Sequence, residues 1–194
     1  KQPGRKPKCT EGMKDPDSLI GWYLRMLTRH HKELLSVCNL IVADAYFSKE
    51  SFASGLKHLG FDLISRFRDD VNLKYLYHGP KTGKKGRPQK FTGKVDINDL
   101  NMDTFHQEYA IDGKQAYKLY TADLWAVSLG REVRVVIVDY IDTDKKRQTR
   151  KVFFSTDLSL SAQDIFDIYR TRFQIEFVYY DKHIIMQSRS KTTS

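Results

Sequence analysis

Three side chains near the end of the sequence have a spacing that suits phosphate chemistry. Tyr169, Arg172 and Glu176 lie in the stretch YRTRFQIEFVYYDKH, and at about 100° per residue they fall within about 60° of one another on a helix. The plainest interpretation is an Arg172–Glu176 ion pair on a surface helix. It does not account for Tyr169 or for the aromatic residues on the adjoining faces, because a carboxylate on a mostly buried helix needs a partner or a metal.

A second acidic residue stands at the end of an apolar run. The stretch NLIVADA (39–45) predicts a short central strand covered on both faces, and Asp44 lies where it ends. Strand ends are where open α/β sheets place ligands and catalytic groups. Taken alone, Asp44 also fits a turn acid or a helix N-cap. Together, Asp44 and Glu176 predict a carboxylate site for Mg²⁺ or Mn²⁺, which are hard cations that prefer oxygen ligands.

The elements around Asp44 have the pattern of a βαβ unit. A helix is predicted after Asp44, with Ser48 as its N-cap and Gly60 at its end, and FDLISRF (61–67) follows as a second strand. A strand, a helix and a strand within about 30 residues favour parallel pairing. An earlier helix is predicted to begin at Ser18, with its apolar positions at Leu19, Trp22, Tyr23, Leu27, Leu34 and Leu35.

The remainder of the chain divides by periodicity. Residues 75–155 alternate as antiparallel strands do, with turns at Asp112-Gly113 and Leu129-Gly130. Helical signals return at Ser161, where Asp164 completes a capping-box-like start. The expected organisation is a mobile start and helix (1–36), a first core part (37–67), a β-rich antiparallel insertion (68–156), a second core part with the Glu176 helix (157–184) and a disordered tail (185–194).

Composition limits the class of protein. The chain has 194 residues, a net charge of +9 and two cysteines, and no apolar run approaches the ~18 residues of a membrane-spanning helix. We therefore expect an α/β domain of a reducing cytoplasm, with a polyanionic partner and no membrane.

At these motifs the sequence resembles a known family. The stretches IVADAYFSKESF, GFDLISRFRDD and YRTRFQIEF are similar to those of bacterial insertion-sequence DDE transposases that carry the Tyr-Arg-Glu-Lys (YREK) signature. Tyr169, Arg172 and Glu176 match the signature in type and spacing. The resemblance covers roughly residues 38–181.

The resemblance implies a fold and an activity. It implies an RNase H-like core with a β-rich insertion ahead of the Glu176 helix, and Mg²⁺-dependent cleavage and strand transfer of transposon-end DNA. Asp44 would be the second Asp of the triad and Glu176 its closing Glu. Tyr169 and Arg172 would serve the DNA phosphates near the cut. The family also implies a bacterial, nucleoid-associated protein that acts as a dimer on paired DNA ends.

The sequence departs from the family pattern at two places. Position 183 is His where the signature has Lys, and Lys182 is one residue early and falls on another helix face. The first Asp has no match, because Asp15 and Asp17 lie in a polar stretch with no strand pattern. The chain is therefore expected to be incomplete at its N-terminus, without the first Asp and the first three core strands.

Two basic segments are expected to contact DNA as loops between strands. They are PKTGKKGRPQKFTGK (80–94) and KKRQTRK (145–151), and their candidate DNA-binding residues are Lys81, Lys84, Lys85, Arg87, Lys90, Lys145, Lys146 and Arg147. A solvated loop is the alternative for each segment. Trp125 and Tyr120 are candidates for base stacking, although such residues in alternating strands more often belong to a core.

Three functions remain open on this basis. The leading one is a DDE transposase catalytic domain. The alternative is a non-catalytic DNA-binding remnant or regulator of a transposase, which the missing Asp favours. The third is a basic α/β domain whose acidic residues are unrelated, and a separation of Asp44 from Glu176 beyond about 10 Å would favour it.

Overall fold

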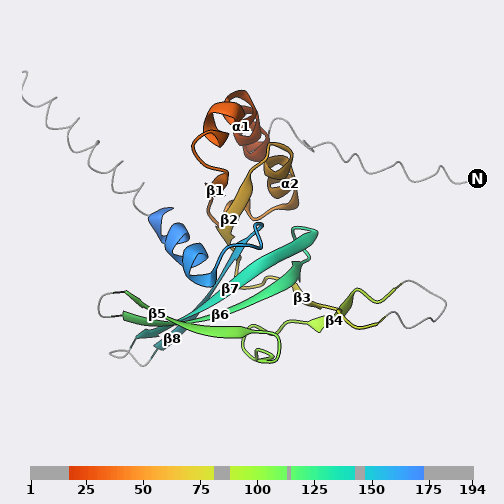
Figure 1. Ribbon diagram of the computed structural model, residues 1–194, viewed down its shortest axis with the longest axis vertical. Helices are drawn as coiled ribbons and strands as arrows, with labels where there is room; N and C mark the ends of the chain where they lie inside the picture. The colour runs from red at the N-terminus through yellow and green to blue at the C-terminus, as the bar shows by residue number, and fades with distance from the viewer. Residues whose placement is uncertain (1–17, 81–87, 113–114, 143–146, 173–194) are drawn as a thin grey trace, which may run out of the picture.

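The computed structural model of the protein describes residues 18–80, 88–112, 115–142 and 147–172. Its elements are α1 (Leu19–Leu35), β1 (Leu40–Val42), the 3₁₀ helix η1 (Ala45–Phe47), α2 (Glu50–His58), β2 (Asp62–Arg66), β3 (Leu73–Leu76), β4 (Phe91–Lys94), β5 (His106–Asp112), β6 (Gln115–Ala126), β7 (Arg131–Asp142) and β8 (Arg147–Ser155). Residues 162–172 form a further helix. Figure 1 shows α1 and α2 gathered at one end of the sheet, and the helix of residues 162–172 rising from the sheet in blue.

The strands described form one sheet rather than two separate ones. Seven of the eight described strands follow the order β1-β2-β8-β7-β6-β3-β4, and the eighth, β5, pairs with β6 outside that path. Only β1 and β2 are parallel, and every other pair is antiparallel. The fold is therefore a mixed α/β fold with a mostly antiparallel sheet. Because β8 pairs directly with β2, the sheet continues from the βαβ unit into the β-rich region.

The predicted βαβ unit is confirmed. Strands β1 and β2 pair in parallel, with Val42 opposite Ile64, and α2 connects them. Gly60 ends α2 in the left-handed region (φ +88°), where a glycine has no Cβ to strain. The amide of Gly60 donates to the Lys57 carbonyl and the amide of Phe61 to the Leu56 carbonyl, which is the Schellman arrangement.

The predicted capping role of Ser48 is wrong. Lys49 occupies the N-cap position of α2 and makes no side-chain cap. The Ser48 hydroxyl donates instead to the carbonyl oxygen of Arg66, at 2.8 Å, and lies 3.0 Å from the Ser65 hydroxyl. Because η1 intervenes between β1 and α2, Ser48 is used to join the end of β1 to β2.

The prediction that residues 39–45 form a central strand covered on both faces is wrong about the central position, for the part of the chain that the structure describes, and right about the covering of both faces. Strand β1 has three residues, all of them half-buried, and it lies at the end of the sheet order. Its apolar side chains pack against the cores on both faces of the sheet, while β2 is its only neighbouring strand among those described. Leu40 and Val42 pack on one side, and Ile41 and Ala43 pack on the other.

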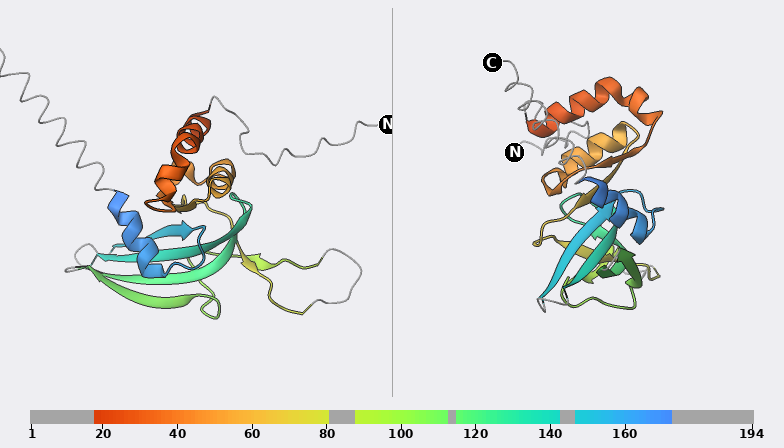
Figure 2. Two further views of the ribbon diagram at one scale, coloured as in Figure 1. Left: turned by 45° about the horizontal axis from the view of Figure 1, so that its top comes forward. Right: turned by 90° about the vertical axis from the view of Figure 1, so that its left-hand side faces the viewer.

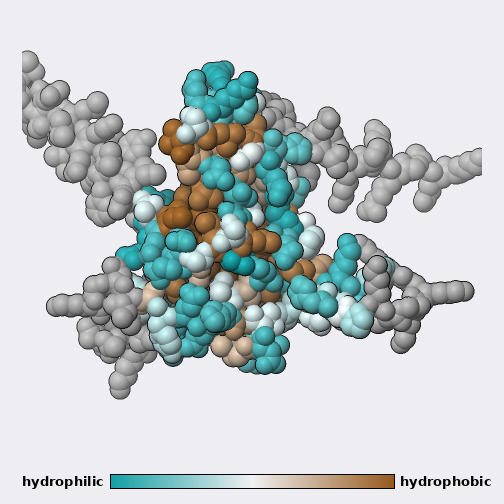
Figure 3. Space-filling view, in the orientation of Figure 1, coloured by the Kyte–Doolittle hydropathy of each residue, from teal (hydrophilic) through white to brown (hydrophobic). Residues whose placement is uncertain are grey.

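Helix α1 begins where the sequence predicts and exposes more apolar surface than its pattern suggests. The Ser18 hydroxyl accepts a hydrogen bond from the Gly21 amide at 3.1 Å, as an N-cap does. The side chains that α1 buries are those of Ile20 and Leu24, whereas Trp22 remains 47% exposed. The other exposed apolar residues of this region are Leu19, Tyr23, Met26, Leu34, Leu35 and Val37. Figure 3 shows hydrophobic surface at this end of the molecule, continuing toward the sheet.

Two apolar cores lie on opposite faces of the sheet. The first joins α1 and α2 to the sheet through residues such as Leu24, Leu56 and Phe154. The second forms between the sheet and the helix of residues 162–172, around Phe166. Figure 2 shows this helix lying against the strands in the view from the side, with α2 and α1 above it.

The β-rich region matches the predicted alternation, with one strand missed. Strands β5 to β8 fall within the predicted runs, and the β6–β7 turn places Gly130 at φ +63° as the Leu129-Gly130 pair predicts. Strand β4 was not expected, because its sequence FTGK is short and contains a glycine. Among the described residues, no helix is long and apolar enough to cross a membrane.

Candidate active site

Asp44 follows β1 in an extended conformation and caps the next turn. Its backbone has φ −76° and ψ 175°, and its Oδ1 accepts a hydrogen bond of 2.8 Å from the Tyr46 amide. Its carbonyl oxygen accepts a hydrogen bond of 2.9 Å from the Ser65 hydroxyl, which ties it to β2. The side chain is exposed, and its Oδ2 has no hydrogen-bond partner among the residues described. Asp44 is thus both the N-cap that the plainer interpretation expects and a carboxylate with one oxygen available to a ligand.

The alternation of β1 and β2 decides which face Asp44 occupies. Leu40 and Val42 pack against the core under the helix of residues 162–172, and the next position in the same alternation is Asp44. The ladder also continues past the last paired residues, because the Ala43 amide donates to the Ile64 carbonyl at 3.0 Å. Continuing this alternation past the ladder directs Asp44 toward the face that carries the helix of residues 162–172.

That helix begins as its sequence predicts. The Ser161 hydroxyl accepts from the Asp164 amide at 3.1 Å and donates to Asp164 Oδ2 at 2.6 Å. Leu160 and Ile165 both pack in the core below the helix, as a hydrophobic staple requires.

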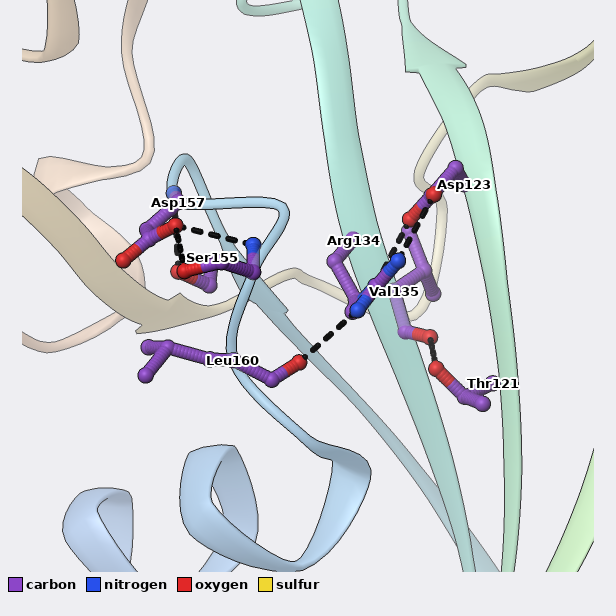
Figure 4. A network of polar contacts seen from close by, with 8 residues as sticks. Thr121, Asp123, Arg134, Val135, Ser155, Asp157 and Leu160 are labelled. Atoms are coloured by element: carbon purple, nitrogen blue, oxygen red, sulfur yellow. Dashed lines mark hydrogen bonds and ion pairs between the residues drawn. The ribbon is translucent and has the colours of Figure 1, made fainter.

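A half-buried arginine ties the start of this helix to the centre of the sheet, as Figure 4 shows. Arg134 on β7 donates from Nε and Nη2 to the two carboxylate oxygens of Asp123 on β6, at 2.8 and 2.9 Å, and from Nη1 to the Leu160 carbonyl oxygen at 3.0 Å. The hydrogen bond to Asp123 raises the pKa of Arg134 above its ordinary value. The helix therefore starts at a fixed point beside β6 and β7.

Tyr169 is packed rather than exposed. It is 5% exposed, and its ring centroid lies 4.8 Å from that of Phe153 on β8. Its hydroxyl has no hydrogen-bond partner among the described residues. The tyrosine of the motif therefore fixes the helix on the sheet through its ring, and only its hydroxyl is left for a ligand.

Arg172 is half-buried and extends over that tyrosine. Its Cζ lies 5.6 Å from the ring centroid of Tyr169, within the range of a cation–π contact. The pair thus lies on one helix face, as the spacing of three residues predicts.

Tyr140 packs among the aromatic residues of the second core. It packs with Tyr117 and Phe166 at centroid distances of 5.3 and 6.3 Å. Burial raises the pKa of Tyr140 to about 12, while Arg170 and Arg66 act in the opposite sense. Two arginines, Arg170 and Arg66, therefore lie close enough to Tyr140 for their charges to act on it.

The raised pKa of Tyr140 gives a prediction for alkaline solution. Since the folded state holds the phenolic proton more tightly, this contribution to stability is fully present below pH 10 and is lost as the pH rises toward about 12. Tyr140→Phe should therefore show a smaller fall in the free energy of unfolding between pH 9 and pH 11 than the unchanged protein, measured by urea unfolding. Tyr109→Phe, at an exposed tyrosine, is the control and should fall as the unchanged protein does. Equal falls for Tyr140→Phe and the unchanged protein would contradict the prediction.

The other predicted site residues are only partly within the described structure. Glu176, Lys81, Lys84, Lys85, Arg87, Lys145 and Lys146 lie outside the described residues. Lys90 is exposed just before β4, and its carbonyl oxygen accepts from the Tyr77 amide at 3.0 Å. Arg147 is the first residue of β8 and lies opposite Asp142 in the ladder, so the prediction that residues 145–151 form a loop is wrong for residues 147–151. In the described part of the chain, no three Asp, Glu, His or Cys residues come together as a metal site.

The basic and aromatic residues singled out in the sheet also differ in their surroundings. Tyr120 packs against the first core, with the Arg150 Cζ 5.7 Å from its ring. Trp125 is half-buried and lies 5.6 Å from Phe91 between ring centroids. Tyr120 therefore has the core position that its strand pattern favours, and Trp125 lies on β6 between Lys74 of β3 and Glu132 of β7.

Two arginines near the site were not anticipated from the sequence. Arg134 orients the start of the helix, and Arg66 ends β2 on the face that carries Asp44. An isolated arginine in an alternating strand carries no motif. Only the position of Arg66, two residues after the apolar run FDLI, could have indicated that it lies beside Asp44.

Comparisons with known proteins add no assignment. No family model matches the chain, and no curated protein matches its sequence.

Proposed function

We propose that this chain belongs to the catalytic domain of a DDE transposase and has an RNase H-like core. In this proposal the domain cleaves and joins DNA phosphodiester bonds with the help of Mg²⁺ or Mn²⁺. The observation that supports the proposal best is that β1, which leads into Asp44, and the helix that carries Tyr169 pack in the same core. The match of Tyr169, Arg172 and Glu176 to the signature spacing is the second support.

Each residue has a role that its surroundings allow. Asp44 offers a carboxylate oxygen to a cation at the end of β1, and Glu176 would supply the next ligand from the continuation of the helix. Arg172 carries a fixed positive charge for a DNA phosphate, and Tyr169 sets the position of that arginine through its ring. When bound, the cation would activate the attacking oxygen and stabilise the leaving oxygen. No residue of the chain is assigned as the first Asp of the triad.

The charge of the chain agrees with a DNA partner. A net charge of +9 over 194 residues favours a polyanion, and the exposed Lys90 belongs to one of the two basic segments. The proposal includes action as a dimer on paired DNA ends in the bacterial nucleoid, which follows from the family resemblance.

The test is cleavage of duplex DNA taken from the regions flanking the coding sequence, with Mg²⁺ and, separately, Mn²⁺. We expect metal-dependent strand cleavage that falls at least about 100-fold in Asp44→Asn, because loss of a metal ligand costs more than loss of its supporting contacts. DNA affinity of this variant, measured by fluorescence anisotropy, should change less than twofold. Asp99→Asn, at an exposed carboxylate on the 95–105 loop, is the matched control and should cleave as the unchanged chain does.

Other outcomes separate the alternatives. Salt-dependent binding without cleavage would support the non-catalytic DNA-binding remnant. Cleavage that survives Asp44→Asn would contradict the assigned role of Asp44. Failure to bind DNA at all would leave only the basic α/β domain.

A further inference from the structure

Ser65 is a buried hydroxyl on an apolar face of β2. Its side chain is 0% exposed, and its neighbours on that face, Leu63 and Phe67, belong to the first core. Burying a hydroxyl in apolar surroundings costs free energy unless it is hydrogen-bonded, whereas an apolar side chain packs there without that cost. The hydrogen bonds that Ser65 makes are therefore what its polar side chain contributes at this position.

The Ser65 hydroxyl joins the two strands at the point where the chain leaves β1. The ladder reaches Ala43, whose amide donates to the Ile64 carbonyl at 3.0 Å. At the next residue, the Ser65 hydroxyl donates to the Asp44 carbonyl oxygen at 2.9 Å. A side chain of β2 therefore holds the backbone of Asp44 just beyond the paired residues of β1 and β2.

A second serine attaches the other end of η1 to the same strand. The Ser48 hydroxyl donates to the Arg66 carbonyl oxygen at 2.8 Å and lies 3.0 Å from the Ser65 hydroxyl. Asp44 is the N-cap of η1 and Ser48 is its C-cap. Both ends of η1 are therefore bonded to β2 through serine hydroxyls.

This attachment sets the direction of the Asp44 carboxylate. Its Oδ1 accepts from the Tyr46 amide of η1 at 2.8 Å, while its carbonyl oxygen is held by Ser65. The Oδ2 atom, which has no hydrogen-bond partner among the described residues, is thereby held in a fixed direction. A ligand oxygen that is ordered in advance binds a cation without the entropic cost of ordering it.

From this arrangement we infer that Ser65, assisted by Ser48, is a positioning residue for the Asp44 carboxylate and thereby sets the affinity of the site for a divalent cation. The identity of the bound ion rests on the proposed function. Ser65 touches neither the cation nor the DNA in this assignment, and it acts only through Asp44. Groups that orient a metal ligand without touching the metal commonly change metal affinity by about 10- to 100-fold when they are removed.

The experiment uses the full chain and three variants: Ser65→Ala, Ser48→Ala and Ser155→Ala. Ser155 is the matched control, because it is also a serine that is 0% exposed, and its hydroxyl accepts from the Asp157 amide at 3.0 Å instead of bonding to Asp44. Far-UV circular dichroism and urea unfolding establish that each variant is folded.

Three quantities are measured for each protein. Hydrogen exchange of the Tyr46 amide is followed by NMR, with the Gly60 amide, which donates to the Lys57 carbonyl, as an internal reference. Binding of Mn²⁺ alone is measured from the electron paramagnetic resonance signal of the free ion. Cleavage of DNA is measured against metal concentration, which separates the metal concentration for half-maximal cleavage from the maximal rate.

We expect the Tyr46 amide of Ser65→Ala to exchange about five to ten times faster, as loss of one hydrogen bond predicts, while the Gly60 amide is unchanged. Mn²⁺ should bind about tenfold more weakly, and half-maximal cleavage should need about tenfold more metal. The maximal rate at saturating metal should fall less than about threefold, because the lost contact acts on metal binding. A purely structural loss would instead lower the cleavage rate at every metal concentration.

The other two variants complete the comparison. Ser48→Ala should change all three quantities in the same direction, and it takes the place of Ser65→Ala if that variant does not fold. Ser155→Ala should stay within about twofold of the unchanged chain in each quantity, because its hydroxyl shares no partner with Asp44.

The outcomes separate this inference from the proposed function. If Ser65→Ala alters Tyr46 exchange and metal affinity no more than Ser155→Ala does, or alters the exchange alone while the unchanged chain binds metal, the inference is overturned and the proposed function stands. If the unchanged chain neither binds Mn²⁺ nor cleaves DNA, the proposed function fails. Faster Tyr46 exchange in Ser65→Ala then still supports the positioning of the Asp44 carboxylate, and unchanged exchange overturns it.

Discussion

Replacing Arg150 with methionine is expected to lower the free energy of unfolding by about 3–5 kcal/mol, because it removes the two-pronged cationic partner of a buried carboxylate. The partner, Asp139 on β7, is 1% exposed. Arg150 on β8 donates to it from Nε at 2.5 Å and from Nη2 at 2.8 Å, and also donates from Nη1 to the Ile97 carbonyl oxygen. The hydrogen bond to Asp139 raises the pKa of Arg150, so the guanidinium remains charged at all ordinary pH values. Loss of the guanidinium therefore removes the charge that allows Asp139 to be buried.

The measurement is urea unfolding at neutral pH, followed by circular dichroism. The double variant Arg150→Met with Asp139→Leu is the control, and it should recover most of the loss because two apolar groups replace the pair. If Arg150→Met lowers the free energy of unfolding by less than about 1 kcal/mol, which is the range of exposed ion pairs, the pair contributes no more than a surface contact.

Truncating Phe166 to alanine is expected to cost a similar amount, about 3–5 kcal/mol, because it opens a cavity in the core beneath the helix of residues 162–172. Phe166 is 1% exposed. Its ring meets Tyr117 at 5.1 Å and Phe153 at 6.0 Å between centroids. Because Tyr169 packs on the same Phe153 ring, the cavity should also loosen the tyrosine that positions Arg172.

Two readouts test this second prediction. Urea unfolding should show the stability loss, and the near-UV circular dichroism of the tyrosines should weaken before global unfolding. Phe166→Leu should lose less stability than Phe166→Ala, since leucine keeps most of the side-chain volume. The control Met102→Ala, at an exposed apolar residue, should change the free energy of unfolding by no more than about 0.5 kcal/mol. If Phe166→Ala is as stable as Met102→Ala, the prediction is wrong, and the contacts at Leu160 and Ser161, where the helix begins, are enough to hold it on the sheet.

Local signals in the sequence predicted several elements well. The Ser18 cap, the Gly60 helix end, the Ser161–Asp164 start and the Leu129-Gly130 turn each depend on interactions within a few residues, and each is present. The parallel β1–β2 pair also followed from the spacing of its elements alone. These features depend on chemistry that a short window of sequence contains.

Features set by distant residues were not predictable in the same way. The run 39–45 is as apolar as a central strand, yet β1 lies at the end of the described sheet, because burial depends on which strands lie beside it. The pairing of β8 with β2 was not visible either, since no local pattern links residues about ninety positions apart. For the candidate site, the sequence proposed Asp44, Tyr169 and Arg172, and the structure brings Arg172 over the ring of Tyr169. It could not indicate Arg66 or Arg134, whose roles arise only from strand register.

The same sheet order has a consequence for how the chain folds. Strands β6 and β7 are joined by a short turn and pair over ten residues, from Tyr117 with Tyr140 to Ala126 with Arg131. That hairpin closes a small loop at little entropic cost, so it can form early. The pairing of Ile64 with Ser155 closes the longest loop in the sheet and must wait until β8 has joined β7. The helix of residues 162–172 follows β8 directly, so its docking belongs to the last steps of assembly, and the face that carries Asp44 is completed only then.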